Sequence, residues 1–522
     1  MAEKQTATCS EHRQSFRNQS LTSRFHWFVW IAVVAYAMGH FATSEVNRSL
    51  PQKVSYRFRY QQGRSPYYGV TRKWDISDRE WRHGRRFILT AWPWMVLHSI
   101  VGRAVAYSVP SLLPHYHITF SLLFVSLKLS WMTTAYFVAV HAVFFVLSWM
   151  QVPALCYGLA LLLVSHHDVF ELDLLKVLFD NRGDHCYFIS VVAFYWTVLR
   201  CLSFCMDHMS RAKEDTSAGD WPDYWKTLAY AVYLPPLFLG PVQNYEDFIT
   251  SVDRTKPPIT LREVYTCVAG VLRSAAHLLL MDLMCHYFYS SALNAAPHLV
   301  EKLDNTSLLG YGATLNVMFF LKYLIQYGVS GGCARIEGIH LPAPPKCVAR
   351  GHLCSHFWRY FDHGLHLWIK KYVYLPIVGA KRSAMRRVMA IAMAFGCVWV
   401  WHSMTTAVTF WATLSFAGVA LEVALEQIKR LNCCKRFDVK NMNPGWARFL
   451  KAAIGSPHYL LTIFACMFYL TNMEITTIFF KRVILGFPMP LIPLLVSLYF
   501  GAYASQDVME WESSAAEKSR VQ

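Results

Sequence analysis

The sequence predicts an all-α polytopic membrane protein, and its composition is the first observation behind that prediction. Of the 522 residues, 54% are hydrophobic and only 16% are charged, whereas soluble domains carry about a quarter charged residues. Apolar runs long enough to span a bilayer also recur along the whole chain, and no polar stretch between them is long enough for a soluble domain. We therefore expect roughly eleven transmembrane helices, joined by re-entrant or interfacial segments.

The clearest apolar runs follow one another along the whole length of the chain. They cover residues 25–41, 136–150, 264–289, 314–329 and 487–504. No small-residue cleavage site follows the first run, so we expect a retained membrane anchor there rather than a signal peptide. We treat the chain, residues 1–522, as one membrane domain.

The net charge of +17 is spread through loops such as DREWRHGRR (78–86) and GAKRSAMRR (379–387). A polytopic protein uses Lys and Arg in its cytosolic loops to set its topology, which alone accounts for such clusters. An anionic head group or a phosphate-bearing cofactor would use them as well. Because there is no soluble basic domain, the sequence argues against nucleic acid as a partner.

Several ionisable side chains lie inside or at the edge of apolar runs. Such groups are costly at membrane depth, so they usually face a protein interior or a wet cavity and mark a functional path. The candidates are His166, His167, Asp168, Asp282, Asp362 and His402. For Asp282 a helix–helix hydrogen bond is also sufficient, and the 166–168 triplet suits an interfacial boundary.

Asp362 and His402 stand out because the chain folds back between them. The stretch RYFDHGLHLWIKKYVYLP (359–376) is followed by a short basic turn and then by an apolar run that ends at His402. If both segments cross the membrane, Asp362 and His402 lie at similar depth, far from the basic turn. Lys370 and Lys371 would then lie mid-membrane, which indicates a tilted segment or a wet funnel.

Several stretches of this chain resemble the membrane-bound O-acyltransferase family. They are YLPPLFLGPVQNYEDF (233–248), WRYFDHGLHLWIKKYVYLPIVGA (358–380) and the Trp401-His402 pair. Two further stretches, FFLKYLIQYGV (319–329) and RIEGIHLPAPPKCV (335–348), are similar to the Hedgehog acyltransferase branch of that family.

That resemblance implies both a fold and an activity. The implied fold is a set of transmembrane helices around a central reaction chamber, with the catalytic core at about residues 225–425. The implied activity is transfer of palmitate from palmitoyl-CoA to the N-terminal cysteine amine of a secreted, Hedgehog-type signalling protein. The implied setting is the membrane of the endoplasmic reticulum or the Golgi, with a long-chain acyl-CoA and membrane lipid as further partners.

The same resemblance implies roles for individual residues. His402 matches the invariant histidine of the family, and Asp362 matches the acid of the Hedgehog branch. Arg359 matches the arginine three positions before that acid. Cys347 matches a cysteine that is the axial ligand of a haem iron, so haem b is an implied cofactor.

The chemistry of acyl transfer suits these residue types. A thioester is already activated, so the enzyme has to position it against an amine and manage one proton. An N-terminal amine has a pKa near ~8, so the imidazole of His402 can take its proton while Asp362 orients the imidazole or the amine. The acyl chain would lie in an apolar pocket and gain about 0.8 kcal/mol per buried methylene. Candidate contacts for the CoA phosphates, besides Arg359, are Lys381, Arg382, Arg386 and Arg387.

A zinc site is an alternative interpretation near the acid. Cys347, His352, Cys354 and His356 form a Cys/His cluster there. Their spacing matches no common zinc framework, so we prefer the haem interpretation for Cys347.

Three other functions stay open. An O-acyltransferase acting on a serine-bearing peptide or a lipid would use the same histidine. A non-catalytic regulator is the second alternative, since related proteins without the histidine only bind or regulate, and the presence of His402 counts against it. A transporter is supported by helix count alone, without an inverted repeat of broken helices. Ser403, where the family often has glycine, and His363, beside the acid, depart from the family's pattern and leave the substrate open.

Overall fold

The structure is almost entirely helical, as the sequence predicts. The computed structural model describes residues 2–53, 60–61, 72–170, 176, 183–214, 223–254, 258–380, 383–428 and 443–521. Within these ranges the only strands are β1 (Tyr60–Gln61) and β2 (Trp74–Asp75), which pair antiparallel. Nine helices in the described ranges are long and apolar enough to cross a membrane, which confirms the all-α polytopic fold class.

The spans are fewer than the roughly eleven expected, because some apolar segments are short or broken. Helix α4 (Leu113–Lys128) has only 16 residues, and the apolar part of α6 (Pro153–Phe170) is also shorter than a full span. The segment that carries Asp362 is divided into four short pieces. These are α16 (Cys354–Phe361), α17 (His363–Ile369), a π-helical turn (Lys370–Tyr374) and α18 (Leu375–Val378).

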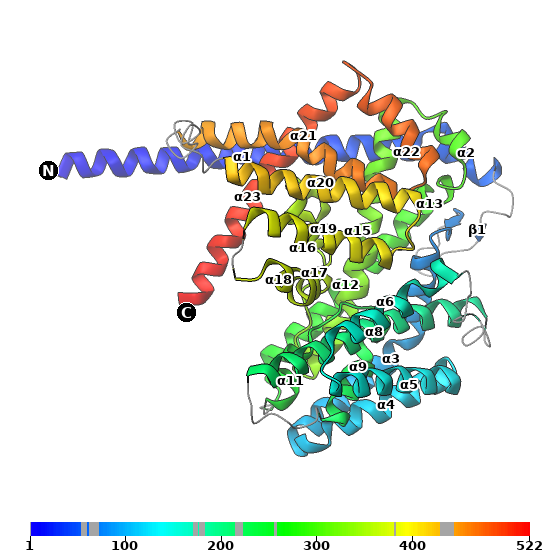
Figure 1. The fold of residues 1–522 in the computed structure, drawn as a ribbon. Coiled ribbons are helices and arrows are strands. Elements are labelled where there is room, and N and C mark those ends of the chain that lie inside the picture. The colour runs from blue at the N-terminus through cyan, green and yellow to red at the C-terminus, as the bar shows by residue number, and fades with distance from the viewer. Residues whose placement is uncertain are drawn as a thin grey trace.

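The helices form two groups, and the first lies in the lower half of Figure 1. Its long helices pack against near neighbours in the sequence, α3 on α4, α5 on α8 and α6 on α8. Its members are α3 (Arg79–Ser108), a short 3-10 turn (Pro110–Leu112), α4, α5 (Trp131–Trp149), α6, α8 (Asp184–Glu214), α9 (Tyr224–Val232), α10 (Leu234–Leu237) and α11 (Tyr245–Asp253).

The second group, in the upper half of Figure 1, combines the two ends of the chain, because α1 packs against α23. In the same group, α19 packs against α20, and α20 packs against α21. The members are α1 (Ala2–Thr43), α2 (Glu45–Lys53), α13 (Ser290–Leu293), α14 (Pro297–Val300), a 3-10 turn (Val348–Arg350), α19 (Ala384–Trp401), α20 (Thr406–Ile428), α21 (Pro444–Leu470), α22 (Met473–Phe479), a π-helical turn (Phe480–Ile484) and α23 (Leu491–Val521).

Helix α15 (Asn305–Ile336) joins the two groups, since it packs against α1, α3, α21 and α12 (Leu261–Tyr287). The Asp304 side chain caps its first turn by accepting hydrogen bonds from two backbone N–H groups. The crossing with α1 is so close that a Cβ at Gly310 would collide with the carbonyl oxygen of Ala37. Only glycine allows that approach, and it fixes α15 at the centre of the molecule.

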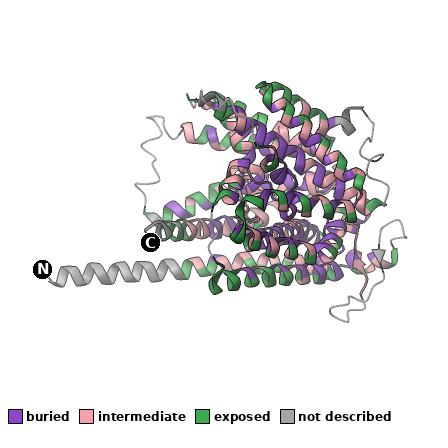
Figure 2. Ribbon diagram, turned by 90° about the horizontal axis from the view of Figure 1, so that it is seen from below, coloured by how far each residue is buried: buried purple, intermediate pink, exposed green. Residues whose placement is uncertain are grey.

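The outer faces of the helices are apolar. Figure 2 shows buried residues gathered where helices meet and exposed residues around the outside. Large apolar side chains on that outside include Phe28, Trp131 and Leu261, which are 72%, 72% and 89% exposed. Surfaces of this kind suit lipid rather than water, in agreement with a multi-pass membrane protein.

Several charged groups in the interior are paired between helices. Asp282 of α12 is only 2% exposed, and both of its carboxylate oxygens accept hydrogen bonds from Arg85 of α3, at 2.7 to 3.1 Å. The pair therefore links two helices, which is the structural role considered for Asp282 above.

Replacing Asp282 with alanine leaves the Arg85 guanidinium uncompensated, so we expect the free energy of unfolding to fall by about 3–5 kcal/mol. Thermal unfolding of the full-length protein in detergent measures this as a lower Tm. Glu45→Ala is the control, because the Glu45–Lys53 pair is exposed and such pairs contribute about 0–1 kcal/mol. Equal Tm values for the two variants would contradict a structural role of Asp282.

Candidate active site

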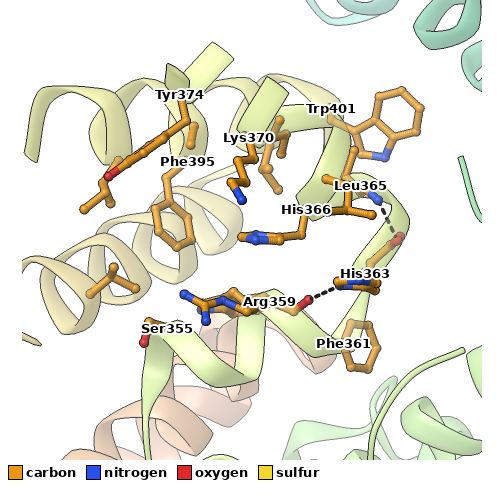
Figure 3. A pocket seen from close by; sticks show the side chains of 18 of the residues that line it. Ser355, Arg359, Phe361, His363, Leu365, His366, Lys370, Tyr374, Phe395 and Trp401 are labelled. Atoms are coloured by element: carbon orange, nitrogen blue, oxygen red, sulfur yellow. Dashed lines mark hydrogen bonds between the residues drawn. The ribbon is translucent and has the colours of Figure 1, made fainter. Parts of the chain in front are cut away.

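A cavity of about 730 Å³ opens among the helices of the central and upper parts of the fold. That volume lies in the range of ligand-binding sites, about 300–1,000 Å³. Side chains from α15, α16, α17, α19, α20 and α21 line it, and both Asp362 and His402 are among them. Figure 3 shows this cavity from close by.

Asp362 lies at the break between α16 and α17 and caps the second of these helices. Its Oδ1 accepts a hydrogen bond from the backbone N–H of Leu365 at 2.9 Å. Its Oδ2 accepts one from the hydroxyl of Tyr327 at 2.6 Å. With both oxygens held, the carboxylate has a fixed orientation on the cavity wall.

His402 is the first residue after α19 and lies on the same cavity. Its Nδ1 is 3.4 Å from the hydroxyl oxygen of Tyr469. The rings of Tyr469 and Trp411 meet the imidazole edge to face, with centroids 4.9 and 5.4 Å away. These contacts fix the ring plane, and Nε2 is the ring nitrogen that they leave for a substrate.

The turn after His402 has an unusual backbone. Ser403 has a φ of 68° and Met404 a φ of 46°, both in the left-handed region that glycine adopts most easily. Glycine at position 403 would adopt this conformation without strain. Here a serine takes it, with some strain.

An aromatic wall on α15 lines the cavity, with one end at Asp362 and the other at Tyr469. Phe319, Tyr323 and Tyr327 follow one another at four-residue intervals on one face of α15 and all line the cavity. Phe319 stacks on Phe361 at 4.8 Å and meets Tyr469 at 5.5 Å. The four-residue spacing of these aromatic side chains was the signal in the sequence from which this wall could have been predicted.

Basic side chains lie in another part of the cavity. Figure 3 shows Arg359, His366 and Lys370 pointing into the same region. Burial, with the positive charges of Arg359 and Lys370 nearby, lowers the pKa of His366 to about 4. The imidazole of His366 is therefore neutral at physiological pH, and the positive charge of this region comes from the other two side chains.

Successive lysines of the π-helical turn have different surroundings. Lys370 lines the cavity, whereas Lys371 lies 2.8 Å from Asp207 of α8 and also donates a hydrogen bond to Glu246. The sequence predicts a wet funnel around both lysines, and the position of Lys370 on the cavity wall agrees with that prediction. Lys371 does not line the cavity and is paired with carboxylates of the protein instead.

The four basic residues that the sequence places between α18 and the first turn of α19 fall into three cases. Arg387 lines the cavity and donates a hydrogen bond to Glu426 at 3.0 Å. Arg386 is exposed and is not among the cavity-lining residues. Lys381 and Arg382 lie outside the described residues.

Cys347 lies in an exposed loop before α16. The cavity beside it has a volume of about 10 Å³, which is room for about one water molecule and not for a haem. The residues around Cys347 in this arrangement therefore do not fit haem, and no chemical step below involves it.

The other predicted residues do not join the cavity as a metal site. His352 bonds to Ser505 at 2.7 Å, and the Cys354 thiol points to the carbonyl of Ser415 at 3.5 Å. Among the described residues, the Cys/His cluster considered above does not form a group of metal ligands. The side chains of residues 166–168, at the end of α6, lie outside the described part of the structure.

Comparison with known proteins identifies the family. Residues 127–471 match the sequence profile of MBOAT, the membrane-bound O-acyltransferase family. The chain belongs to this family. It is therefore an enzyme of the acyltransferase type, and the matched range includes every residue named above on the cavity wall.

Individual MBOAT proteins are similar over much of the chain. Protein-cysteine N-palmitoyltransferase Rasp of Drosophila melanogaster is 26% identical over 88% of this chain and 90% of its own length. Protein-cysteine N-palmitoyltransferase HHAT of Mus musculus is 25% identical over 61% of this chain and 64% of its own length. Membrane-bound O-acyltransferase GUP1 of Saccharomyces cerevisiae is 23% identical over 78% and 77% of the two chains.

The strained turn after His402 gives a prediction. Ser403→Gly removes the strain, so its Tm should equal or exceed that of the natural protein. Ser403→Val puts a β-branched residue into the left-handed region and should cost about 1–2 kcal/mol, with lower acyltransferase activity because His402 shifts. Thermal unfolding and acyl transfer of both variants test this. A valine variant as stable as the glycine variant would contradict it.

Proposed function

We propose that this chain transfers a palmitoyl group from palmitoyl-CoA to the N-terminal cysteine amine of a secreted, Hedgehog-type signalling protein. The names of Rasp and mouse HHAT support the acyl group and the cysteine acceptor. We propose the endoplasmic reticulum membrane as its location, because a secreted acceptor passes through that compartment, and residues 225–425 as its catalytic core.

One observation carries this proposal. A carboxylate with a fixed orientation and an imidazole both lie on the wall of the same cavity, and the rest of that wall is largely apolar. Asp362 and His402 come from separate elements, and both reach this cavity. Apolar side chains such as Ile391, Phe395 and Val398 line it as well. A long acyl chain needs such a surface, while its thioester needs the two polar groups.

In the proposed reaction, the amine nitrogen attacks the thioester carbonyl while Nε2 of His402 takes the amine proton. The carbon–nitrogen bond of the amide forms and the carbon–sulfur bond breaks. The departing CoA thiolate takes the proton from the imidazolium, which returns His402 to its neutral form. Asp362, held by Tyr327, orients the incoming amine and stabilises the positive charge that develops on it.

The basic region of the cavity is the proposed contact for the CoA phosphates. Arg359, Lys370 and Arg387 line the cavity and supply positive charge. Lys381, Arg382 and Arg386 stay in the proposal only on the basis of the sequence. Haem b at Cys347 rests on the resemblance alone and enters none of these steps.

The similarity to GUP1 supports a second candidate, transfer to a hydroxyl group on a serine-bearing peptide or a lipid. The same cavity and the same histidine would serve that reaction, because a hydroxyl also has to lose a proton as it attacks. The two candidates differ in the acceptor, so the assay has to offer both.

The decisive assay uses purified full-length protein in detergent with palmitoyl-CoA. We expect palmitate to reach a peptide with an N-terminal cysteine, but not the same peptide with an acetylated N-terminus or one with an internal serine. His402→Ala and Asp362→Ala should each lower the rate ~100-fold or more. Mass spectrometry of the peptides measures the transfer.

His141→Gln is the matched control, since His141 is a fully buried imidazole of α5 that bonds to Thr227 and does not line the cavity. It should retain activity. Transfer to serine or to a lipid instead of the amine would favour the second candidate. Undiminished transfer by the His402 variant would contradict both.

Arg387 gives a prediction about the donor. Removing its charge with Arg387→Ala should raise the KM for palmitoyl-CoA about tenfold, with little change in kcat. Lys451→Ala is the control, because Lys451 is exposed on α21 and does not line the cavity. Steady-state kinetics with varied palmitoyl-CoA measure both. An unchanged KM in the arginine variant would exclude Arg387 as a CoA contact.

A further inference from the structure

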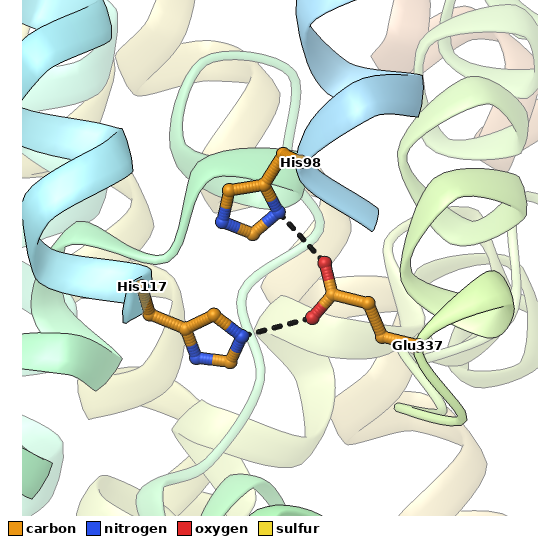
Figure 4. Close-up of side chains that lie close together, drawn as sticks. All are labelled: His98, His117 and Glu337. Carbon is orange, nitrogen blue, oxygen red and sulfur yellow. Dashed lines mark hydrogen bonds and ion pairs between the residues drawn. The ribbon is translucent and has the colours of Figure 1, made fainter. Parts of the chain in front are cut away.

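Three buried side chains far apart in the sequence converge outside the catalytic cavity. They are His98 of α3, His117 of α4 and Glu337, the residue that follows α15, and Figure 4 shows them together. One possible ligand atom from each lies within 4.8 Å of the others. None of the three side chains is more than 1% exposed.

The donor set is that of a transition-metal site. Two imidazole nitrogens and a carboxylate are the ligands that Zn²⁺ takes in many proteins. His98 Nδ1 lies 2.7 Å from Glu337 Oε1, and His117 Nε2 lies 2.9 Å from Glu337 Oε2. The cluster therefore offers one donor atom from each of three side chains to one ion.

The contact between His98 and Glu337 lacks the alignment of a hydrogen bond. His98 Nδ1 and Glu337 Oε1 are both buried, and neither has a hydrogen-bond partner within the described part of the chain. A nitrogen and an oxygen that lie this close without the alignment of a hydrogen bond are compatible with two ligand atoms that share a cation.

The charge of the cluster also suits a bound cation. Two other buried carboxylates face a cationic side chain, Asp282 with Arg85 and Asp207 with Lys371. Glu337 instead meets the two imidazoles and the hydroxyl of Tyr233, which donates a hydrogen bond to Oε2 at 3.1 Å. A divalent ion would balance the carboxylate, with Tyr233 orienting it from outside.

The backbone leaves room for the carboxylate. Gly102 lies one helical turn after His98 on the same face of α3, and a Cβ there would lie 2.9 Å from the carboxyl carbon of Glu337. A larger residue would displace the carboxylate from the imidazoles. Glycine at this position is therefore part of how the cluster is built.

We propose that His98, His117 and Glu337 bind one Zn²⁺ ion, and that this ion is structural. It joins α3, α4 and the end of α15, the helix that carries Tyr323 and Tyr327 to the catalytic cavity. Its role is to hold that end of α15 against the first group of helices. The proposal does not depend on the acyl acceptor or on acyltransferase activity.

The first experiment measures metal in the full-length protein purified in detergent without a metal-affinity tag. We expect about one zinc ion per chain by mass spectrometry of the elements, and a Tm that falls by several degrees with a chelator and recovers when Zn²⁺ is added. Replacement by Co²⁺ should give the visible absorption of a tetrahedral site. A metal content at background, with no change of Tm on adding Zn²⁺, overturns the proposal and leaves a metal-free cluster.

Variants separate this site from adventitious zinc. Glu337→Gln keeps the shape of the side chain but removes a charged ligand, so metal content and the response to the chelator should both be lost. His141→Gln, at a buried histidine outside the cluster, should keep both. Zinc retained at the same level in Glu337→Gln overturns the proposal. If that variant does not fold, the Co²⁺ spectrum of the natural protein decides alone.

Discussion

The absence of water from the bilayer interior is the constraint on which this structure depends. A charge that leaves water there costs several kcal/mol unless the protein supplies a partner. The chain meets that condition by pairing charges between helices, Arg85 with Asp282 and Lys322 with Glu80 at 2.7 Å. Each pair therefore also determines which helices are neighbours.

The same constraint explains where the irregular backbone lies. Unpaired peptide groups are tolerated at membrane depth only beside protein or a water-filled space. The pieces from α16 to α18 break the helix repeatedly, and several of their residues line the cavity. A helix begins at the break beside Asp362, and the backbone N–H of Leu365 in its first turn holds one oxygen of the carboxylate in place. The irregular backbone and the proposed catalytic carboxylate thus share one location.

The sequence was sufficient for the fold class, because the length of an apolar segment is a local property. It indicated Asp362 and His402 through their position at two ends of a fold-back. It could not give the Tyr469 contact or the convergence of His98 with Glu337, because those depend on helix packing between segments distant in the sequence. The small cavity beside Cys347 likewise depends on packing that spacing does not report.

The π-helical turn at Lys370–Tyr374 has a consequence for how this chain can change by insertion or deletion. A π-helical turn contains one residue more than the equivalent α-helical turn, and each residue of an α-helix rotates the side-chain direction by about 100°. Losing one residue here would rotate everything that follows relative to what precedes. Lys370 could then no longer line the cavity while Lys371 pairs with Asp207. The length of this segment, and not only its composition, is thus constrained.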